Sequence, residues 1–384
     1  MTVGSALNKI RRAALSPRRS LGAISGKAMR QHSYWLGNGR SIPPASVCLF
    51  MTYRCNLRCK MCDLWGENGS RREGTPVSTR STQEELSQKE IRTLVDDLAS
   101  FKPKVTLFGG EPLFHGRTHE VLQCLRDRNI PTSIITNGVL LGAHFRQLVD
   151  LKVDEITISL DGPREVHDSI RGVQGTYDKA IAGIVATAEY KRRKHSAVPR
   201  LKVLYTISDM NFRHLNDFVK GLEGLQLDLV NFYHVMFVNE ELLRRHNAVF
   251  MEAFGITSNS LRGFARDVSS RVGLDDLAEQ ISLIKTGNHR VPVEFLIDFT
   301  PEELRRYYTD FSFSPKSRCL VPWREVLILP DGSVSPCLDF IAGNVREESF
   351  LRIWNGPRFI HFRRTLKRLG KFPACNRCCL LYRD

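Results

Sequence analysis

Short apolar stretches alternate with amphipathic stretches over the first two thirds of the chain. The apolar stretches are rich in β-branched and aromatic residues and predict buried strands, whereas the others carry apolar residues at helical spacing and predict helices. The predicted strands are 47–53, 104–110, 131–138, 154–162, 200–208 and 227–237, and the predicted helices are 81–101, 116–129, 140–151, 175–194 and 211–224. Within the first helix, Ser87 and Glu90 have the spacing of a capping box.

Apolar strands that alternate with helices indicate parallel βαβ units. Six such strands predict an α/β fold, namely a partial (βα)6 TIM-like barrel. Glycines and polar residues stand at the ends of these strands, and in such folds ligands lie at the C-terminal ends of the strands. We therefore expect the functional site at that end of the barrel.

The alternation ends near residue 238. Helices are predicted at 239–254 and 259–285, and a further helix begins at Thr300, the predicted N-cap before Pro301. The sequence "EVLILPDGSVSPC" then predicts a hairpin around a Pro-Asp-Gly turn, and residues 357–369 predict a basic amphipathic helix. These changes divide the chain into a basic N-terminal extension (1–46), a barrel core (47–237), a helical insertion or linker (238–316) and a small C-terminal domain (317–384).

Basic residues are concentrated at the two ends of this 384-residue chain, whose formal net charge is +15. Residues 1–46 contain eight Lys or Arg and no Asp or Glu, and residues 357–384 contain eight Lys or Arg and one acid. Such ends favour an anionic partner, and solvated tails are the plainer interpretation. Leu7, Ile10 and Ala14 line one side of a short amphipathic turn, which suits an anionic membrane surface.

Several classes of protein are not expected from this composition. No stretch of eighteen apolar residues predicts a transmembrane helix, and no recognisable module predicts nucleic-acid binding. We expect a cytoplasmic protein that contacts a membrane peripherally. An organelle transit peptide is the alternative for the Arg-rich, acid-free N-terminus.

Eight of the ten cysteines fall into two groups, which without a secretion signal indicate metal binding rather than disulfides. Cys55, Cys59 and Cys62 form a C-x3-C-x2-C motif after the first predicted strand. A structural zinc site and an ordinary cubane each take four protein ligands. Because three thiolates leave one corner open, we interpret these cysteines as ligands of a [4Fe–4S] cluster with one free iron. Half of a zinc site completed elsewhere is the alternative.

The motif resembles the cysteine motif of the radical S-adenosylmethionine (radical SAM) superfamily. The resemblance implies that S-adenosylmethionine chelates the free iron and is reductively cleaved to a 5′-deoxyadenosyl radical, which abstracts hydrogen from the substrate. It also implies an external one-electron reductant of the flavodoxin or ferredoxin type. In the usual family pattern an aromatic residue precedes the third cysteine, where this chain has Met61.

Three further strand ends resemble the cofactor-binding motifs of that superfamily, and a nearby arginine stands where related enzymes hold the cofactor carboxylate. The motifs are "GGEP", "TNG", "SLDG" and "HDSIRG". The resemblance implies that S-adenosylmethionine is bound by Gly109, Gly110, Glu111, Asn137, Ser159, Asp161 and Arg171. Turn chemistry and a surface salt bridge are the alternatives for the last three residues.

The C-terminal cysteines suggest a second, closed site. Cys319 and Cys337 flank the predicted hairpin, and Cys375 and Cys378 form a C-x2-C pair. The arrangement resembles the SPASM region and its shorter relative, the twitch domain, which implies one auxiliary [4Fe–4S] cluster on these four residues. Cys379 is the alternative to Cys378, and a Zn(Cys)4 site is the alternative to iron.

The superfamily does not specify the reaction. Our first expectation is a radical SAM oxidoreductase acting on a small molecule such as a sugar or a lipid-linked compound, with the auxiliary cluster accepting an electron. The alternatives are a maturase that modifies a ribosomally made peptide or protein, and a non-catalytic zinc-stabilised binding protein. Near the ends of the fifth and sixth strands, Asp209, Asn211, Tyr233 and His234 are candidates to face the substrate, with a packed core histidine as the alternative for His234.

Overall fold

The computed structural model describes residues 17–71, 85–338 and 340–382. Two sequence predictions fall outside these ranges. The amphipathic turn at Leu7, Ile10 and Ala14 lies wholly outside them, and the first residues of the helix expected at 81–101 also do.

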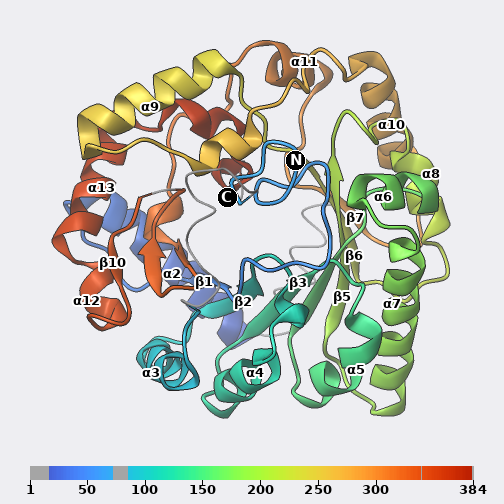
Figure 1. Cartoon of the computed structure of the whole chain (residues 1–384), viewed down its shortest axis with the longest axis horizontal. Helices are drawn as coiled ribbons and strands as arrows, with labels where there is room; N and C mark the ends of the chain where they lie inside the picture. Colours follow the sequence, from blue (N-terminus) through green and yellow to red (C-terminus); the bar gives the residue numbers. More distant parts are fainter. Residues whose placement is uncertain (1–16, 72–84, 339, 383–384) are drawn as a thin grey trace.

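One curved sheet forms the frame of the described part of the chain. Its strand order is β10-β9-β8-β1-β2-β3-β4-β5-β6-β7, and Figure 1 shows the sheet arching around one side of the molecule. The strands are β1 (Ser46–Phe50), β2 (Lys104–Phe108), β3 (Thr132–Thr136), β4 (Glu155–Ser159), β5 (Arg200–Ile207), β6 (Leu229–His234), β7 (Val293–Phe295), β8 (Glu325–Ile328), β9 (Ser333–Ser335) and β10 (Gly343–Asn344).

The sheet is an open partial barrel, as the sequence predicts. Strands β1 to β7 pair in parallel and in chain order. The predicted hairpin of β8 and β9 is present, and β8 also pairs in parallel with β1, so the C-terminal segment continues the barrel sheet. Because β7 and β10 stand at opposite ends of the strand order, the barrel is not closed. Neither β7 nor the pairing of β8 with β1 was predicted from the sequence.

Helices cover the outer face of this sheet (Figure 1). They bury apolar stripes against it; in the first of them the Ser87–Glu90 capping box is confirmed, and Ile91, Leu94 and Leu98 are buried. The helices that follow strands are α3 (Gln88–Ala99), α4 (Thr118–Asp127), α5 (Leu141–Asp150), α6 (Arg164–Arg171), α7 (Thr176–Arg193) and α8 (Leu215–Gly221). The later helices are α9 (Glu240–Phe254), α10 (Leu274–Thr286), α11 (Pro301–Thr309), α12 (Phe350–Trp354) and α13 (Pro357–Leu369).

The single helix predicted at 259–285 is wrong. The structure has a short 3-10 helix, Ser260–Phe264, then an irregular segment, and only then α10. The reason is packing: a side chain at Gly263 would stand 2.4 Å from the backbone oxygen of Asp63, so this segment is held against the cysteine loop instead of continuing as a helix.

The ends of the chain also differ from the sequence prediction. A 20-residue helix, α2 (Pro17–Leu36), occupies part of the N-terminal extension, where only a short turn was expected. A basic amphipathic helix would expose its cations, but in α13 Arg363 is fully buried, with its guanidinium carbon 4.0 Å from the ring centroids of both Trp354 and Phe359. No helix in the described ranges is long and apolar enough to cross a membrane.

The N-terminal end of the barrel is closed by charged side chains. Glu155 on β4 lies 3.2 Å from Lys104 on β2, and 2.9 and 2.7 Å from Arg200 and Lys202 on β5. These cations lower the pKa of Glu155 despite its burial. The opposite, C-terminal end is therefore the one left for a ligand.

Candidate active site at the C-terminal end of the barrel

The three cysteines of the N-terminal motif lie on the loop that follows β1. Backbone amides point at two of the sulfurs: Leu57 donates to Cys55 Sγ, and Leu64 donates to Cys62 Sγ, each at 3.4 Å. Burial raises the pKa of Cys55 to about 11 and that of Cys62 to about 12. These thiols therefore stay protonated at neutral pH unless a cation is bound beside them, and amide donors around the sulfurs suit an iron–sulfur cluster.

The "GGEP" glycines hold this loop against the end of β2. Gly110 donates its amide to Thr52 O at 2.7 Å, and Glu111 donates its amide to Arg54 O at 2.9 Å. A Cβ at Gly110 would lie 2.2 Å from Arg54 O, and Gly109 has a φ of +133°, so both positions need glycine. The close approach here is to the cysteine loop itself, which fixes where Cys55 begins.

Glu111 joins the ends of β2 and β3. Its buried carboxylate accepts from Thr136 Oγ1 at 2.7 Å, from the Asn137 amide at 2.8 Å and from the Leu113 amide at 3.0 Å. Burial raises its pKa although these donors oppose the shift. Glu111, which was predicted to contact the cofactor, therefore positions the end of β3.

Asn137 and Arg171 both reach the cysteines. Asn137 Nδ2 lies 2.8 Å from Asn56 Oδ1 and 3.9 Å from Cys55 Sγ. Arg171 Nη1 lies 3.8 Å from Cys59 Sγ. Sequence reasoning grouped these residues by motif alone, and the structure brings them together around one space.

Arg171 also forms a buried ion pair with Asp161. The Nη2–Oδ2 distance is 2.5 Å, and Asp161 additionally accepts from the Thr206 amide at 3.1 Å. Burial disfavours the charged form of Arg171, yet Asp161 and Cys59 raise its pKa overall. Arg171 Nε has no hydrogen-bond partner among the described residues, so this guanidinium keeps a donor for a ligand. The alternative interpretation of Arg171 as part of a surface salt bridge is therefore wrong.

Ser159 is the last residue of β4 and is half-buried. Its neighbour Ile158 faces the helices, where it lies against Gly138 near Ala180. By strand alternation Ser159 points to the inner face of the barrel, where the sequence predicts it.

The residues proposed at the ends of β5 and β6 separate into two kinds. His234 is a packed core residue: its Nδ1 lies 2.8 Å from the Tyr308 hydroxyl, and burial lowers its pKa to about 3. Asn211 is buried and donates to Asp161 O at 2.9 Å, so it supports the ion pair from behind. Asp209 and Tyr233 are only half-buried and stay candidates to face a substrate.

The insertion after β6 reaches the cysteine loop, a contact that the sequence did not reveal. Asn68 Nδ2 donates to Ala265 O at 2.6 Å, and Val238 donates its amide to Phe264 O at 2.9 Å. Arg266 follows directly and is the cation that acts on half-buried Asp63, with Asp209 and Cys62 also close enough to act on its charge. The insertion thus brings one positive charge to the Cys62 side of the loop.

A second group missed by sequence reasoning lies beside Cys55. The carboxylate of Glu85 binds Thr52 Oγ1 at 2.5 Å, His115 Nε2 at 3.3 Å and Arg54 Nη2 at 3.4 Å. It ties the residues after β1 to those after β2. No motif marks Glu85, which sits in a stretch that sequence periodicity assigns to a helix.

The C-terminal cysteines lie close enough together to act on one another's charge. Cys375 is buried, and the neighbouring thiols of Cys319, Cys337 and Cys378 add to the burial that raises its pKa well above the usual value. Cys378 likewise faces Cys319, Cys337 and Cys379. Cys378 acts on Cys375, and Cys379 acts on Cys378, so both stay candidates for the fourth ligand.

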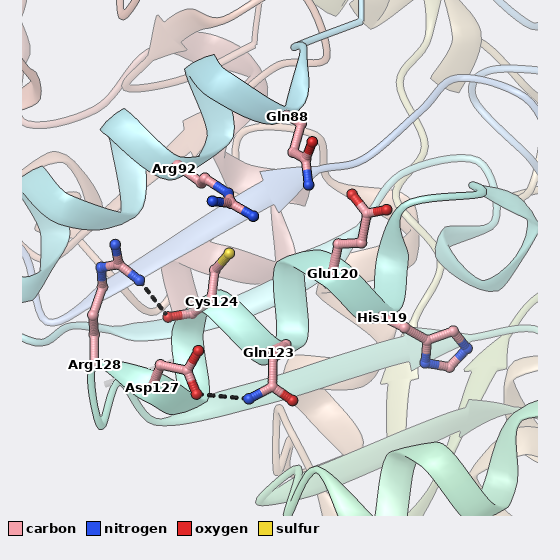
Figure 2. A pocket seen from close by; sticks show the side chains of 8 residues that line it. All are labelled: Gln88, Arg92, His119, Glu120, Gln123, Cys124, Asp127 and Arg128. Atoms are coloured by element: carbon pink, nitrogen blue, oxygen red, sulfur yellow. Dashed lines mark hydrogen bonds between the residues drawn. The ribbon is translucent and has the colours of Figure 1, made fainter.

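These sites differ from simple ion sites, and two surface pockets lie outside them. Within the described ranges, no three His, Cys, Asp or Glu side chains are arranged to hold one metal ion. A pocket of about 440 Å³ lies between α3 and α4, lined by polar side chains that include Arg92, Glu120 and Arg128 (Figure 2). Another, of about 260 Å³, is lined by Lys60 of the cysteine loop, by Ser169 of α6 and by Met210, which follows β5. Only the second adjoins the cysteine motif.

Two family models match parts of the chain. The model of the radical SAM superfamily matches residues 49–220, and that of the SPASM iron–sulfur cluster-binding domain matches residues 319–379. These two matches contain the two groups of cysteines.

Two curated relatives are similar in sequence. Fe-coproporphyrin III synthase of Methanosarcina barkeri is 31% identical over 206 residues, which are 50% of this chain and 46% of that protein, so the match spans less than half of that relative. PqqA peptide cyclase of Xanthomonas axonopodis pv. citri is 28% identical over 334 residues, which are 84% of this chain and 77% of the cyclase.

A solved structure shares the fold over nearly the whole chain. Streptococcus suis SuiB bound to S-adenosylmethionine has a TM-score of 0.60 at 15% identity, and the match covers 94% of this chain and 77% of SuiB. SuiB bound to the precursor peptide SuiA has a TM-score of 0.58 at 15% identity, covering 87% and 70% of the two chains. At this identity the likeness shows the fold alone.

Proposed function

This chain belongs to the radical SAM superfamily and carries a C-terminal SPASM domain, and from this premise we propose that it is an enzyme that modifies a peptide or protein. Its cofactors are S-adenosylmethionine, a [4Fe–4S] cluster and an auxiliary iron–sulfur cluster. Reductive cleavage of S-adenosylmethionine supplies a 5′-deoxyadenosyl radical that takes a hydrogen atom from the substrate. The external electron donor is proposed to be of the flavodoxin or ferredoxin type.

The residues that hold these groups follow from the geometry. Cys55, Cys59 and Cys62 are proposed as the three ligands of the first cluster, since amides donate to the sulfurs of Cys55 and Cys62, and Asn137 and Arg171 reach those of Cys55 and Cys59. The free Nε of Arg171 suits the carboxylate of S-adenosylmethionine. Gly109, Gly110 and Glu111 act by placing the loop, and Ser159 is proposed to contact the cofactor directly.

The auxiliary cluster is proposed to be a [4Fe–4S] cluster on Cys319, Cys337, Cys375 and Cys378. The thiols of Cys319, Cys337 and Cys378 all act on buried Cys375 and, together with burial, raise its pKa, so a bound cation is needed for these groups to ionise together. A closed set of four thiolates suits an electron acceptor, which would make the reaction an oxidation. Zinc in the same four thiolates is the competing assignment.

One observation carries the peptide substrate. The alignment with PqqA peptide cyclase runs through most of both chains, and SuiB, which shares the fold, binds the precursor peptide SuiA. The relatives thus favour the peptide or protein maturase over the small molecule that the sequence analysis placed first.

Transfer of deuterium to the cofactor product tests this substrate class. The reconstituted enzyme is incubated with fractions of a deuterium-labelled extract of the source organism, and 5′-deoxyadenosine is examined by mass spectrometry. We expect deuterium in this product only with fractions whose effect protease treatment destroys. A protease-resistant, low-molecular-mass fraction as the only source would contradict the proposal. The Cys55/Cys59/Cys62 triple Ala variant is the control for cofactor cleavage.

A small-molecule substrate is the second candidate, supported by the higher identity to Fe-coproporphyrin III synthase. The same labelling experiment separates the two, because only the small-molecule enzyme accepts deuterium from the protease-resistant fraction. Sugar and lipid-linked substrates would be found in the protease-resistant fraction.

A further inference from the structure

The described residues at the end of α2 lie beside the basic helix α13. The C-terminal end of α2 and the residues after it pack against α13, and Figure 1 places both helices on the same side of the molecule. Lys367 Nζ donates to Trp35 O at 2.7 Å, and Arg364 Nε donates to Asn38 O at 2.9 Å. Buried Arg363 fixes the contact by donating to Gly39 O at 3.0 Å. Charges that are more than 300 residues apart in sequence are therefore concentrated in one place.

A third segment without acidic residues completes this surface. The guanidinium of Arg318 lies 4.8 Å from the ring centroid of Trp35, and Lys371 Nζ donates to Lys316 O at 2.8 Å. The three contributing segments, 28–46, 311–322 and 357–374, contain no Asp or Glu. The exposed cations of these segments are Arg40, Arg318, Arg358, Arg364 and Arg368. Arg358 stands at the other end of α13, where it donates to Ile341 O.

Large apolar side chains are exposed among these cations. Met29, Trp35, Leu36 and Leu369 are 53%, 50%, 71% and 43% exposed, and they are four of the ten exposed large apolar side chains in the described ranges. Met29 and Leu36 are seven residues apart on α2 and so share one side of the helix. Trp35 is half exposed, whereas Trp323 and Trp354 are buried.

We propose that this basic–apolar face, made of Met29, Trp35, Leu36 and Leu369 with Arg40, Arg318, Arg364 and Arg368, binds the headgroup region of an anionic phospholipid membrane. Tryptophan and leucine enter the boundary between headgroups and acyl chains, while arginines bind anionic headgroups. An acid-free surface suits many anions, but exposed leucine and methionine gain nothing from a nucleic-acid backbone. The proposal goes beyond the proposed function and does not depend on the substrate.

The face also adjoins the auxiliary site. Arg318 precedes Cys319, whose amide donates to Gly370 O at 2.9 Å, and Leu369 precedes Gly370. Attachment through this face therefore puts the C-terminal cysteine group next to the lipid headgroups.

Co-sedimentation of the full reconstituted chain with phospholipid vesicles tests the proposal. We expect binding to phosphatidylcholine vesicles that contain phosphatidylglycerol, little binding to pure phosphatidylcholine, and weaker binding as salt is added. The Arg40→Glu/Arg368→Glu variant should bind at least about ten-fold more weakly, since each cation near an anionic surface contributes on the order of 1 kcal/mol. Arg364 is left unchanged because it holds Asn38.

The matched control reverses two exposed cations on another helix. Arg192→Glu/Arg193→Glu, at the end of α7, changes the net charge equally and should bind like the wild type. Equal loss in both variants, or no loss in either, would overturn the proposal, because the contact would then be nonspecific or lie elsewhere in the chain. Circular dichroism confirms that both variants are folded.

Tryptophan fluorescence gives an independent readout. Of the four tryptophans, Trp35 is half exposed, so vesicles should shift the emission to shorter wavelength, and Trp35→Phe should abolish this shift. In separate binding experiments, RNA or polyglutamate replaces the vesicles as an alternative anionic probe. Binding of either polymer without binding of anionic vesicles would refute the membrane proposal.

Discussion

Arg171 joins Asp161 to the cysteine loop: its Nη2 lies 2.5 Å from Asp161 Oδ2, and its Nη1 lies 3.8 Å from Cys59 Sγ. Asp161 is completely buried and Arg171 nearly so. One guanidinium therefore satisfies a carboxylate at the end of β4 and also orients the second cysteine. From the sequence, Arg171 is predicted only to bind the cofactor, but it also holds the end of β4 and the cysteine loop together.

We predict that Arg171→Gln destabilises the protein by about 3–5 kcal/mol, because it leaves the buried Asp161 carboxylate without a counterion. Urea unfolding followed by circular dichroism measures this free energy. Arg171→Gln combined with Asp161→Asn should cost less than the single Arg171→Gln change, since no uncompensated charge is then buried. A double variant less stable than that single variant would contradict this account of the pair.

Gly110→Ala should prevent correct placement of the cysteine loop. Its Cβ would lie 2.2 Å from Arg54 O, a backbone atom that cannot move without moving Cys55. We expect a cost of about 1–3 kcal/mol from overpacking and a loss of iron bound per chain after anaerobic reconstitution.

Gly116→Ala is the matched control, because nothing lies within 4 Å of a Cβ at that position. It should bind iron as the wild type does. Normal iron content in Gly110→Ala would show that the close approach of β2 does not set the loop.

The sequence predicted the partial barrel and the sites at its open end, because both depend on local patterns. Strand periodicity gave β1 to β6, and cysteine spacing marked Cys55, Cys59 and Cys62. What it missed depends on contacts between distant segments. Burial of Arg363 rests on Trp354 and carbonyl groups from elsewhere in the chain, and no periodicity encodes those partners.

The same limit explains the insertion. Residues 259–285 have helical periodicity, but Gly263 must pack against Asp63, which is two hundred residues earlier. A local pattern cannot report that contact. The contact of Arg266 with Asp63 was missed for the same reason.

Arg266→Gln should shift the midpoint potential of the first cluster to more negative values. Arg266 is a cation that faces Asp63 and Cys62, and removal of a nearby positive charge disfavours the more negative, reduced cluster. Potentiometric titration followed by electron paramagnetic resonance measures the shift, in a Cys375→Ala/Cys378→Ala background that lacks the auxiliary signal.

Arg271→Gln serves as the control for Arg266, since Arg271 is exposed and lies 3.8 Å from Asp209. It should leave the potential near that of the parent, and Arg266→Lys, which keeps the positive charge, should also shift the potential little. Equal shifts in the Arg266→Gln and Arg271→Gln variants would mean that general surface charge, and not the position of Arg266, sets the potential.

Glu155 should make the stability of the barrel depend on pH in the acid range. Lys104, Lys202 and Arg200 lower the pKa of this carboxyl below its usual value of 4.5, so the ionised form is favoured in the folded state. Its contribution is complete above the unfolded pKa and is lost as the pH falls through the folded pKa. We predict that Glu155→Gln lowers the free energy of unfolding by about 1–3 kcal/mol at pH 7, because the ion pairs are lost. The difference between wild type and variant should shrink below about pH 4.5, which urea titrations at several pH values would show. A difference that stays constant down to the acid transition would mean that Glu155 acts through packing and not through its charge.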